Sequence, residues 1–408
     1  MELDEIWIVS AKRTPMGRFQ GELATYSAPQ LGAIAIRAAI EQSSIQGELI
    51  DELFMGCVLT AGCGQAPARQ AALKAGLPDS VPCTTINKVC GSGMKSVMLA
   101  YDLIRSGSIR CAVAGGMESM SNAPYLLKES RAGMRMGHKT TFDHMFLDGL
   151  QDAYQGELMG VYGQRIADTL NFSRQEMDNW AEQSLQRALA AQSQGMFSVE
   201  IAAIETASQA ESASSWFDFD ELPPSIDPAK IAKLKPAFSP QGSITAANSS
   251  AISDGASALI VMDQACAEHN GVTPLAVIKG HATHARLPEE FTVAPVYAIE
   301  TLLSTLDWDV EDVDLWEINE AFAVVAQIAV KELGLDSNKV NIKGGACALG
   351  HPIGASGARI ITTLIYSLRQ LQAYGIDGDA TQRKTMRGIA AICIGGGEAT
   401  AIAVEIPL

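Results

Sequence analysis

The 408-residue sequence contains few of the residues that bind metal ions or nucleic acids. It holds six histidines, and its eight cysteines form no Cys-x-x-Cys pair, so we expect no zinc site. No apolar run approaches the roughly 20 residues that a membrane-spanning helix needs. Lys and Arg number 30 against 46 Asp and Glu, which gives a formal net charge of −16. Such a surface disfavours non-specific binding to nucleic acid or to anionic membranes.

Targeting signals are also absent from the ends of the sequence. The first residues, MELDEIWIVS, have neither the basic start nor the apolar core of a secretory signal, and the final EIPL is not a peroxisomal address. We therefore expect a cytoplasmic protein whose cysteines remain reduced, without a disulfide framework.

Short β-branched runs alternate with helical patterns along both ends of the chain. Continuous apolar stretches predict strands, and apolar residues at helical spacing predict helices. This alternation indicates an α/β protein with a mixed sheet. The predicted strands are 6–11, 52–59, 110–116, 313–318, 389–394 and 399–406, and the predicted helices are 29–42, 94–104, 321–334 and 360–368.

The middle of the chain has a different composition. Residues 121–250 are polar and rich in Met, Gln and Ser, which predicts an inserted loop domain that covers a site. The insertion separates an N-terminal α/β half, 1–120 completed by 251–272, from a C-terminal half, 273–408. Each half has a Gly-rich turn, a helix and a strand that ends in glycines, which suggests a duplicated unit.

Four Gly-rich or strand-end turns hold candidate catalytic residues. Cys90 in NKVCGSGMKSV precedes a predicted helix, whose free N–H groups and dipole would stabilise a thiolate. His351 in KGGACALGHPIGASGAR is a candidate general base or oxyanion donor. Cys393 precedes three glycines in CIGGGEA, and Asn319 in INEAF lies where a strand changes to a helix. Taken singly, Cys90 could be a buried structural cysteine and Asn319 a helix cap.

Together these motifs resemble the thiolase family. The similar segments are SAKRTPMGRFQG, VCGSG, AGGMESMS, NSSAISDGAS, NEAFA, the run around His351 and the closing CIGGGEA, and they occur in the family's order over the whole chain. The resemblance implies two similar α/β halves in a layered α/β/α/β/α core, with the inserted domain over the active site. The implied activity is that of an acetyl-CoA C-acetyltransferase, which joins two acetyl-CoA molecules into acetoacetyl-CoA and CoA by a reversible Claisen condensation.

The resemblance also implies catalytic roles. Cys90 would carry the acyl group, His351 would accept the Cys90 proton, and Cys393 would be the acid/base at the methyl carbon. Asn319, through a bound water, and His351 would stabilise one oxyanion; the backbone N–H groups of Cys90 and Gly395 would stabilise the other. No metal or redox cofactor is expected, because CoA is itself the substrate carrier.

Further residues are implied to bind CoA and the acyl group. The family pattern places pantetheine beside Ser250, and the other expected contacts are Met159, Leu234 and Phe322. A basic patch in KIAKLKPAF would attract the CoA phosphates, with a solvated helix face as the less favoured alternative; its members are Lys230, Lys233 and Lys235. Met159 and Phe291 would fill the space of a longer acyl chain.

Quaternary structure is implied by another segment of the insertion. The stretch SRAGMRMGHKTTFDHM, residues 130–145, resembles the family's tetramerisation loop. We therefore expect a homotetramer, a dimer of dimers.

Three positions depart from the family pattern. An arginine that often stacks on the CoA adenine has no counterpart in ELPPSID, residues 221–227, and Leu158 replaces a histidine of some biosynthetic relatives. Glu398 stands where many relatives have Gln, a change expected to be without consequence.

Rival functions remain open. The nearest is a degradative thiolase acting on longer 3-ketoacyl-CoAs. A β-ketoacyl synthase is disfavoured, because that family lacks the second cysteine. A non-catalytic acyl-CoA-binding relative is disfavoured by the presence of Cys90, His351 and Cys393.

Overall fold

A single large mixed sheet runs through the computed structural model, which describes residues 5–206, 215–374 and 385–408. The first half of the chain contributes β1 (Ile6–Arg13), β2 (Gly17–Arg18), β3 (Glu52–Gly56), β4 (Cys83–Ile86), β5 (Cys111–Ser119) and β10 (Ser253–Asp263). The second half contributes β11 (Ala276–Ala285), β12 (Leu315–Ile318), β13 (Met386–Ile394) and β14 (Glu398–Ile406). The strand order is β12-β13-β14-β11-β1-β10-β5-β3-β4, and β2 pairs with β10.

The two halves of the sheet repeat one topology. In the first half β3 is parallel to β5, which is antiparallel to β10, which is antiparallel to β1. The second half repeats this pattern: β12 is parallel to β13, which is antiparallel to β14, which is antiparallel to β11. The halves meet where β1 and β11 pair antiparallel, with Ile6 opposite Ile278. The predicted duplicated unit is therefore confirmed at the level of topology.

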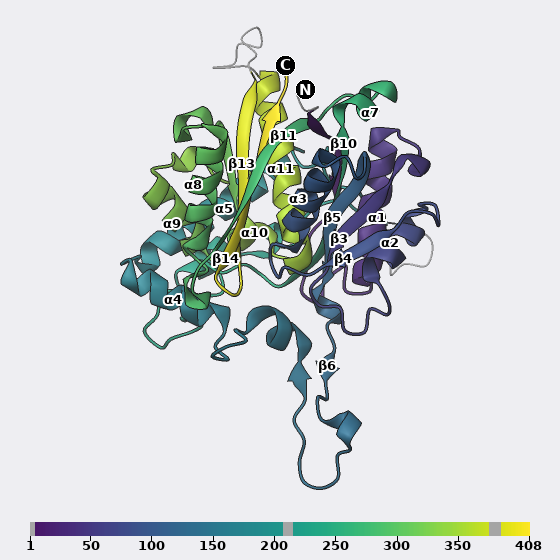
Figure 1. Cartoon of the computed structure of the whole chain (residues 1–408). Coiled ribbons are helices and arrows are strands. Elements are labelled where there is room, and N and C mark those ends of the chain that lie inside the picture. Colours follow the sequence, from purple (N-terminus) through teal and green to yellow (C-terminus); the bar gives the residue numbers. More distant parts are fainter. Residues whose placement is uncertain (1–4, 207–214, 375–384) are drawn as a thin grey trace.

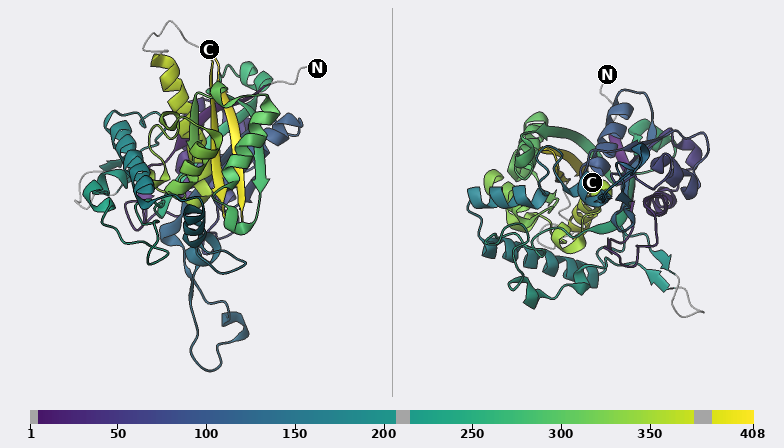
Figure 2. Two further views of the ribbon diagram at one scale, coloured as in Figure 1. Left: turned by 90° about the vertical axis from the view of Figure 1, so that its left-hand side faces the viewer. Right: turned by 90° about the horizontal axis from the view of Figure 1, so that it is seen from below.

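Three layers of helices enclose the two halves of the sheet (Figure 1, Figure 2). The helices of the two halves are α1 (Ala28–Ser43), α2 (Pro67–Ala75), α3 (Ser92–Arg105), α7 (Gln264–His269), α8 (Ala294–Leu306), α9 (Ala323–Leu333), α10 (Ala346–Leu349) and α11 (Ile353–Tyr374). Helices α3 and α11 pack against each other between the two halves, α1 and α2 cover one outer face, and α8 and α9 cover the other. This arrangement confirms the predicted α/β/α/β/α layering.

Close contact between α3 and α11 explains several glycines of the two motifs. A Cβ added at Gly93 would lie 2.9 Å from the backbone nitrogen of Ala358, and one at Gly357 would overlap the backbone of Met94. Side chains at these positions would force the helices apart. The glycines after Cys90 and His351 therefore bring together the two helices that follow those residues.

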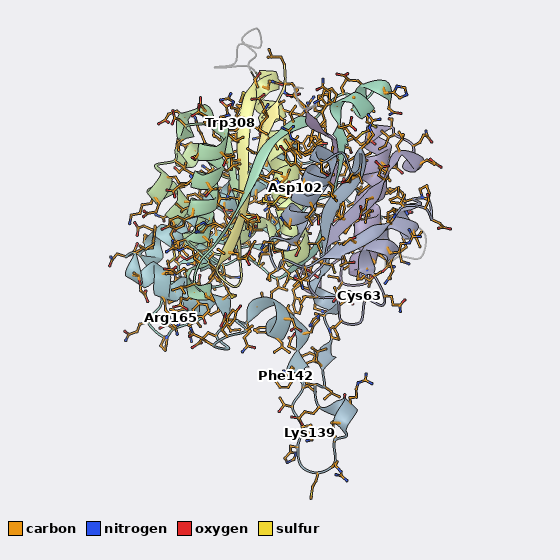
Figure 3. All side chains as sticks on the ribbon, viewed as in Figure 1. Cys63, Asp102, Lys139, Phe142, Arg165 and Trp308 are labelled. Carbon is orange, nitrogen blue, oxygen red and sulfur yellow. The ribbon has the colours of Figure 1, made fainter. Side chains whose placement is uncertain are left out.

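The inserted region between β5 and β10 contains short strands and helices. Its elements are β6 (Tyr125–Leu126), β7 (Phe142–Asp143), α4 (Met159–Thr169), α5 (Arg174–Ser193), β8 (Ile204–Thr206), β9 (Ser215–Phe217) and α6 (Pro228–Ile231). β6 and β7 form the base of a hairpin that extends away from the body, with Phe142 near its base and Lys139 farther out (Figure 3). In the part of the chain that the structure describes, no helix is long and apolar enough to cross a membrane.

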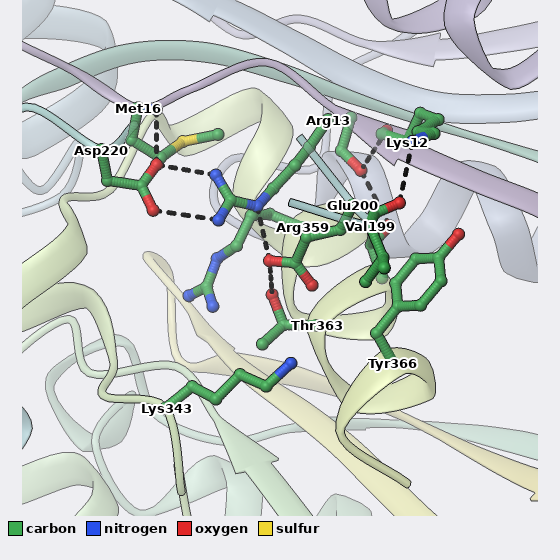
Figure 4. A network of polar contacts seen from close by, with 12 residues as sticks. Lys12, Arg13, Met16, Val199, Glu200, Asp220, Lys343, Arg359, Thr363 and Tyr366 are labelled. Carbon is green, nitrogen blue, oxygen red and sulfur yellow. Dashed lines mark hydrogen bonds and ion pairs between the residues drawn. The ribbon is translucent and has the colours of Figure 1, made fainter. Parts of the chain in front are cut away.

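A buried ion cluster anchors the insertion to the core (Figure 4). Arg13 of β1 donates to both carboxylate oxygens of Asp220, at 2.7 and 2.9 Å, and to Glu200 at 2.8 Å. Thr363 of α11 donates to the same Glu200 oxygen at 3.2 Å. All three charged side chains are fully buried. Burial opposes the positive charge of Arg13, but the two carboxylates outweigh this effect and raise its pKa.

One predicted strand is shorter in the structure. The sequence predicts a strand over 52–59, but β3 ends at Gly56. The N–H groups of Val58 and Leu59 instead donate to the carboxylate of Glu118, at 3.0 and 3.1 Å. The buried carboxylate of Glu118 thus accepts the hydrogen bonds that a neighbouring strand would accept if β3 continued to residue 59.

The ion cluster leads to a prediction on stability. Arg13→Met removes the cation that forms ion pairs with two buried carboxylates, so we expect the free energy of unfolding to fall by about 3–5 kcal/mol. Chemical denaturation measures this loss. The control is Arg18→Ala, which breaks a pair with Glu221 whose arginine side chain is 56% exposed and should cost less than about 1 kcal/mol. Equally small losses in both variants would contradict the anchoring role.

Candidate active site

Cys90 lies in the turn immediately before α3, in contact with a second turn. The N-cap of α3 is Gly91, and Val89 has a φ of 46°. The backbone N–H of Gly395, which follows β13, donates to the Cys90 thiol. Burial raises the pKa of this thiol to about 11, because desolvation outweighs the hydrogen bonds from Gly395 and from the backbone of Cys90 itself. Backbone N–H groups thus favour the Cys90 thiolate, but burial opposes it more strongly, so removal of the Cys90 proton needs a base.

His351 supplies an imidazole with a free nitrogen. Its Nδ1 lies 2.5 Å from Oγ of Ser356, and that hydroxyl donates to the carbonyl of Pro352 at 2.9 Å. Since the hydroxyl hydrogen is used there, Nδ1 carries the hydrogen of the imidazole and Nε2 has the lone pair. Nε2 has no hydrogen-bond partner among the described residues. Burial, with the positive charge of Arg359, lowers the pKa of His351 to about 3, so the ring is a neutral base.

Cys393 is the second thiol of this region. It is buried at the end of β13, opposite Ala399 of β14. Burial raises the pKa of Cys393 well above its usual value, and the neighbouring Cys90 raises it further. Both cysteines are free. The structure thus brings together Cys90, Cys393 and Gly395 as the sequence predicted.

Asn319 carries an unused amide. It follows β12, and neither its side-chain oxygen nor its nitrogen has a hydrogen-bond partner within the described part of the chain, although the residue is buried. It does not cap a helix, because α9 begins four residues later with Phe322 as its N-cap. A buried amide with two free polar atoms is suited to hold a water or a substrate oxygen.

A cavity of about 210 Å³ opens beside His351. It contains three of the predicted binding residues, Met159, Ser250 and Phe322. The inserted region supplies much of its apolar wall: Phe146, Leu150, Leu158, Met159, Gly160 and Phe238. The sequence analysis noted Leu158 as a departure but did not predict Phe146 or Phe238, for which no motif gives a signal.

A second cavity of about 250 Å³ contains the other predicted contacts, Lys230 and Leu234. Ala251 lines both cavities, which therefore adjoin. Lys230 is exposed and lies 3.5 Å from Asp227, and Lys233 and Lys235 are also exposed.

Phe291 lies outside the lining of both cavities. It is buried behind the wall, where its ring packs edge-on against Phe322 with centroids 6.3 Å apart. Its influence on an acyl group is therefore exerted through Phe322 rather than by contact.

Glu118 is a central residue that the sequence analysis did not single out. Its buried carboxylate accepts the N–H of Gly354 in the first turn of α11, at 2.9 Å, in addition to those of Val58 and Leu59. Burial raises its pKa to about 7, although these N–H groups oppose the shift. Because Gly354 is three residues from His351, Glu118 ties the histidine turn to the end of β3.

Family models match nearly the whole chain. The model of the N-terminal thiolase domain matches residues 6–265, and that of the C-terminal thiolase domain matches residues 272–406. The chain belongs to the thiolase family. This match confirms the family predicted from the motifs.

Relatives of this thiolase are similar over nearly their whole length. Acetyl-CoA acetyltransferase 1 of Arabidopsis thaliana is 46% identical, with 98% of this chain and 94% of the relative covered. Acetyl-CoA acetyltransferase of Cupriavidus necator is 45% identical, with 99% and 100% covered. The crystal structure of Acat5 thiolase from Ascaris suum in complex with coenzyme A has a TM-score of 0.91 at 38% identity, with 98% and 100% covered.

The thiol geometry predicts a distinct pH profile for this thiolase without substrate. Alkylation of Cys90 by iodoacetamide should keep rising as the pH approaches about 11, because the thiol stays protonated below that pH. Peptide mass spectrometry measures the rate at each cysteine. Cys63 is the internal control: a hydrogen bond with Cys57 lowers its pKa to about 7, so its rate should level off near pH 8. A Cys90 rate that levels off near pH 7 would contradict the protonated thiol.

Proposed function

We propose that this thiolase is an acetyl-CoA C-acetyltransferase that works through an acetyl-Cys90 intermediate. The observations that carry the proposal are a protonated Cys90 thiol before α3 and, beside an apolar cavity, a neutral His351 whose Nε2 has no hydrogen-bond partner among the described residues. The names of relatives at 42–46% identity support the same activity. We also propose that it acts in the cytoplasm.

In the first half-reaction His351 takes the proton of Cys90. The thiolate then attacks the carbonyl carbon of acetyl-CoA, the carbon–sulfur bond to CoA breaks, and the CoA sulfur leaves with the proton. The negative charge that develops on the carbonyl oxygen needs donors already in place. The N–H groups of Cys90 and Gly395 are assigned to this oxyanion.

In the second half-reaction His351, neutral again once CoA has left, takes the proton of Cys393, and the Cys393 thiolate removes a proton from the methyl carbon of another acetyl-CoA. The carbanion attacks the acetyl group on Cys90 and forms the new carbon–carbon bond of acetoacetyl-CoA. The Cys90 thiolate that is released takes its proton back from His351. The enolate oxygen is assigned to His351 and to a water on Asn319, whose amide is otherwise unused. These steps move only protons and acyl groups, so the proposal includes no metal ion and no redox cofactor.

Coenzyme A is proposed to lie across the two adjoining cavities. The pantetheine would lie beside Ser250, with Met159, Phe322 and Leu234 nearby. Lys230, at the rim of the second cavity, together with exposed Lys233 and Lys235 would attract the phosphates of the nucleotide end. The CoA-bound state of the Ascaris suum thiolase supports a site for this ligand in the shared fold.

The two half-reactions can be separated by one substitution. Cys393→Ser should still accept the acetyl group of acetyl-CoA on Cys90, because that step uses only His351 and the oxyanion donors. Carbon–carbon bond formation should fall by roughly 10²-fold or more, since a hydroxyl is a far weaker base than a thiolate. Peptide mass spectrometry detects the acetyl group, and an acetoacetyl-CoA assay follows the condensation. Label on another cysteine with Cys90 free, or near-normal condensation, would contradict the assignment.

The cavity predicts a preference for short acyl chains. Met159 narrows the space beside Gly395, its Cε lying 3.7 Å from a Cβ built there, and Phe322 is held from behind by Phe291. Each excluded methylene loses about 0.8 kcal/mol of burial, so kcat/KM for 3-ketooctanoyl-CoA should be roughly one to two orders of magnitude below that for acetoacetyl-CoA. Thiolysis assays on both substrates measure this difference in kcat/KM. Equal or faster cleavage of the longer substrate would favour the degradative alternative.

We further propose a homotetramer built from two dimers. The hairpin based on β6 and β7 exposes large apolar side chains; the clearest are Tyr125, Met134 and Met136, at 69%, 50% and 90% exposure. An apolar strip of this kind on a projecting segment is typical of an interface (Figure 3). Light scattering should give the mass of four chains at micromolar concentration. A monomer would contradict the proposal. A dimer would contradict the tetramer and leave only the dimer.

A further inference from the structure

Two turns that are distant in sequence meet around the two reactive thiols. The first turn contains Cys90 and precedes α3; the second, Gly395–Gly397, joins β13 to β14 directly after Cys393. The N–H of Gly395 donates to the Cys90 thiol. A Cβ added at Gly91 would overlap the side chain of Ile394. The turns are therefore in contact both at the thiol and behind it.

An ion pair links the same two turns at a third point. Nζ of Lys88, two residues before Cys90, contacts Oε2 of Glu398, the first residue after the glycine turn. The lysine side chain is 22% exposed and the glutamate side chain 35%. Pairs with this exposure contribute little to the free energy of folding. Their effect on geometry can still be large where both ends are fixed.

Both ends of this pair are fixed by backbone hydrogen bonds. The N–H of Lys88 donates to Oγ of Ser92 at 2.8 Å, and its carbonyl accepts the N–H of Gly91 at 3.1 Å. Glu398 lies opposite Ile394 in the β13–β14 register. The backbone at each end of the pair is therefore held within its turn, and the ion pair links the two turns through their side chains.

We infer that Lys88 and Glu398 are positioning residues that hold the Cys90 turn and the Cys393–Gly397 turn in register for carbon–carbon bond formation. The inference rests on the proposed function, because that reaction needs the acetyl group on Cys90, the N–H of Gly395 and the thiol of Cys393 in one geometry. A misplacement of about 1 Å in such a site can reduce the rate by roughly a hundredfold. Glu398, which sequence comparison treats as a harmless replacement for Gln, has a defined role here.

The kinetic test uses single substitutions and a charge exchange. Lys88→Ala and Glu398→Ala should lower kcat by roughly tenfold or more and change KM for acetyl-CoA by less than about threefold, because bound substrate still meets the same cavity. The double exchange Lys88→Glu with Glu398→Lys should restore kcat to within about threefold of wild type. Glu398→Gln keeps an acceptor for Lys88 and should retain most of the activity.

A matched control lies at the other end of the same hairpin. Glu405 of β14 is partly exposed and pairs with Arg387 at 3.2 Å, far from both thiols. Glu405→Ala should leave kcat within about twofold of wild type, and all variants should keep the wild-type melting temperature. Wild-type kcat in both alanine variants would overturn the inference. A loss of kcat that follows a loss of melting temperature, without rescue by the charge exchange, would overturn it too.

A second measurement does not depend on turnover. If the register is lost, the hydrogen bond from Gly395 to the Cys90 thiol weakens, and the pH at which Cys90 becomes alkylated should rise in Glu398→Ala. Simple removal of a negative charge would instead move this pH down. A downward or absent shift would therefore overturn the inference. A wild-type enzyme that is inactive on acetyl-CoA would refute the proposed function. The pH at which Cys90 becomes alkylated would still test whether Lys88 and Glu398 hold the two turns in register.

Discussion

Direct packing of two glycine-bearing helices is the constraint on which the site depends. Gly93 of α3 and Gly357 of α11 permit a backbone approach that any side chain would prevent. Because Cys90 immediately precedes one helix and His351 the other, this approach brings a nucleophile and a base from opposite halves of the chain to the same end of the central layer. The neighbouring strands β12 and β13 of the second half then need only supply Asn319 and Cys393 at their ends.

Burial makes the side chains of this site reactive, and it also costs desolvation free energy. It raises the pKa of the Cys90 and Cys393 thiols and of Glu118, and it lowers that of His351, so both thiols and the imidazole are neutral at pH 7. Neutral side chains suit a site that would bind apolar acyl groups. Buried charges occur in the cluster around Arg13, where Arg13 pairs with both Glu200 and Asp220 (Figure 4).

Local patterns in the sequence predicted most of the fold and the turns that hold the candidate catalytic residues. The apolar runs around GGG at 395–397 predict the β13–β14 hairpin, and the motif glycines identify the turns that carry Cys90 and His351. Features that depend on residues distant in the sequence could not be predicted from local patterns. The end of β3 depends on Glu118, the protonated state of Cys90 depends on its burial, and the place of Phe291 depends on packing against Phe322. The partnership of Lys88 with Glu398 joins residues 310 positions apart, which no local pattern reports. The domain boundaries at 120, 250 and 272 remain predictions.

The repeated topology gives the inserted region a particular meaning. In the second half, β13 and β14 are joined by the short turn that follows Cys393; in the first half, the equivalent strands β5 and β10 are joined by residues 120–252. The same connection is thus a short glycine turn after Cys393 in one copy of the repeated topology and a long insertion in the other, where it supplies much of the wall of the cavity beside His351. Since β5 and β10 stay hydrogen-bonded whatever joins them, the insertion can change in length and lining while the sheet beneath it is preserved.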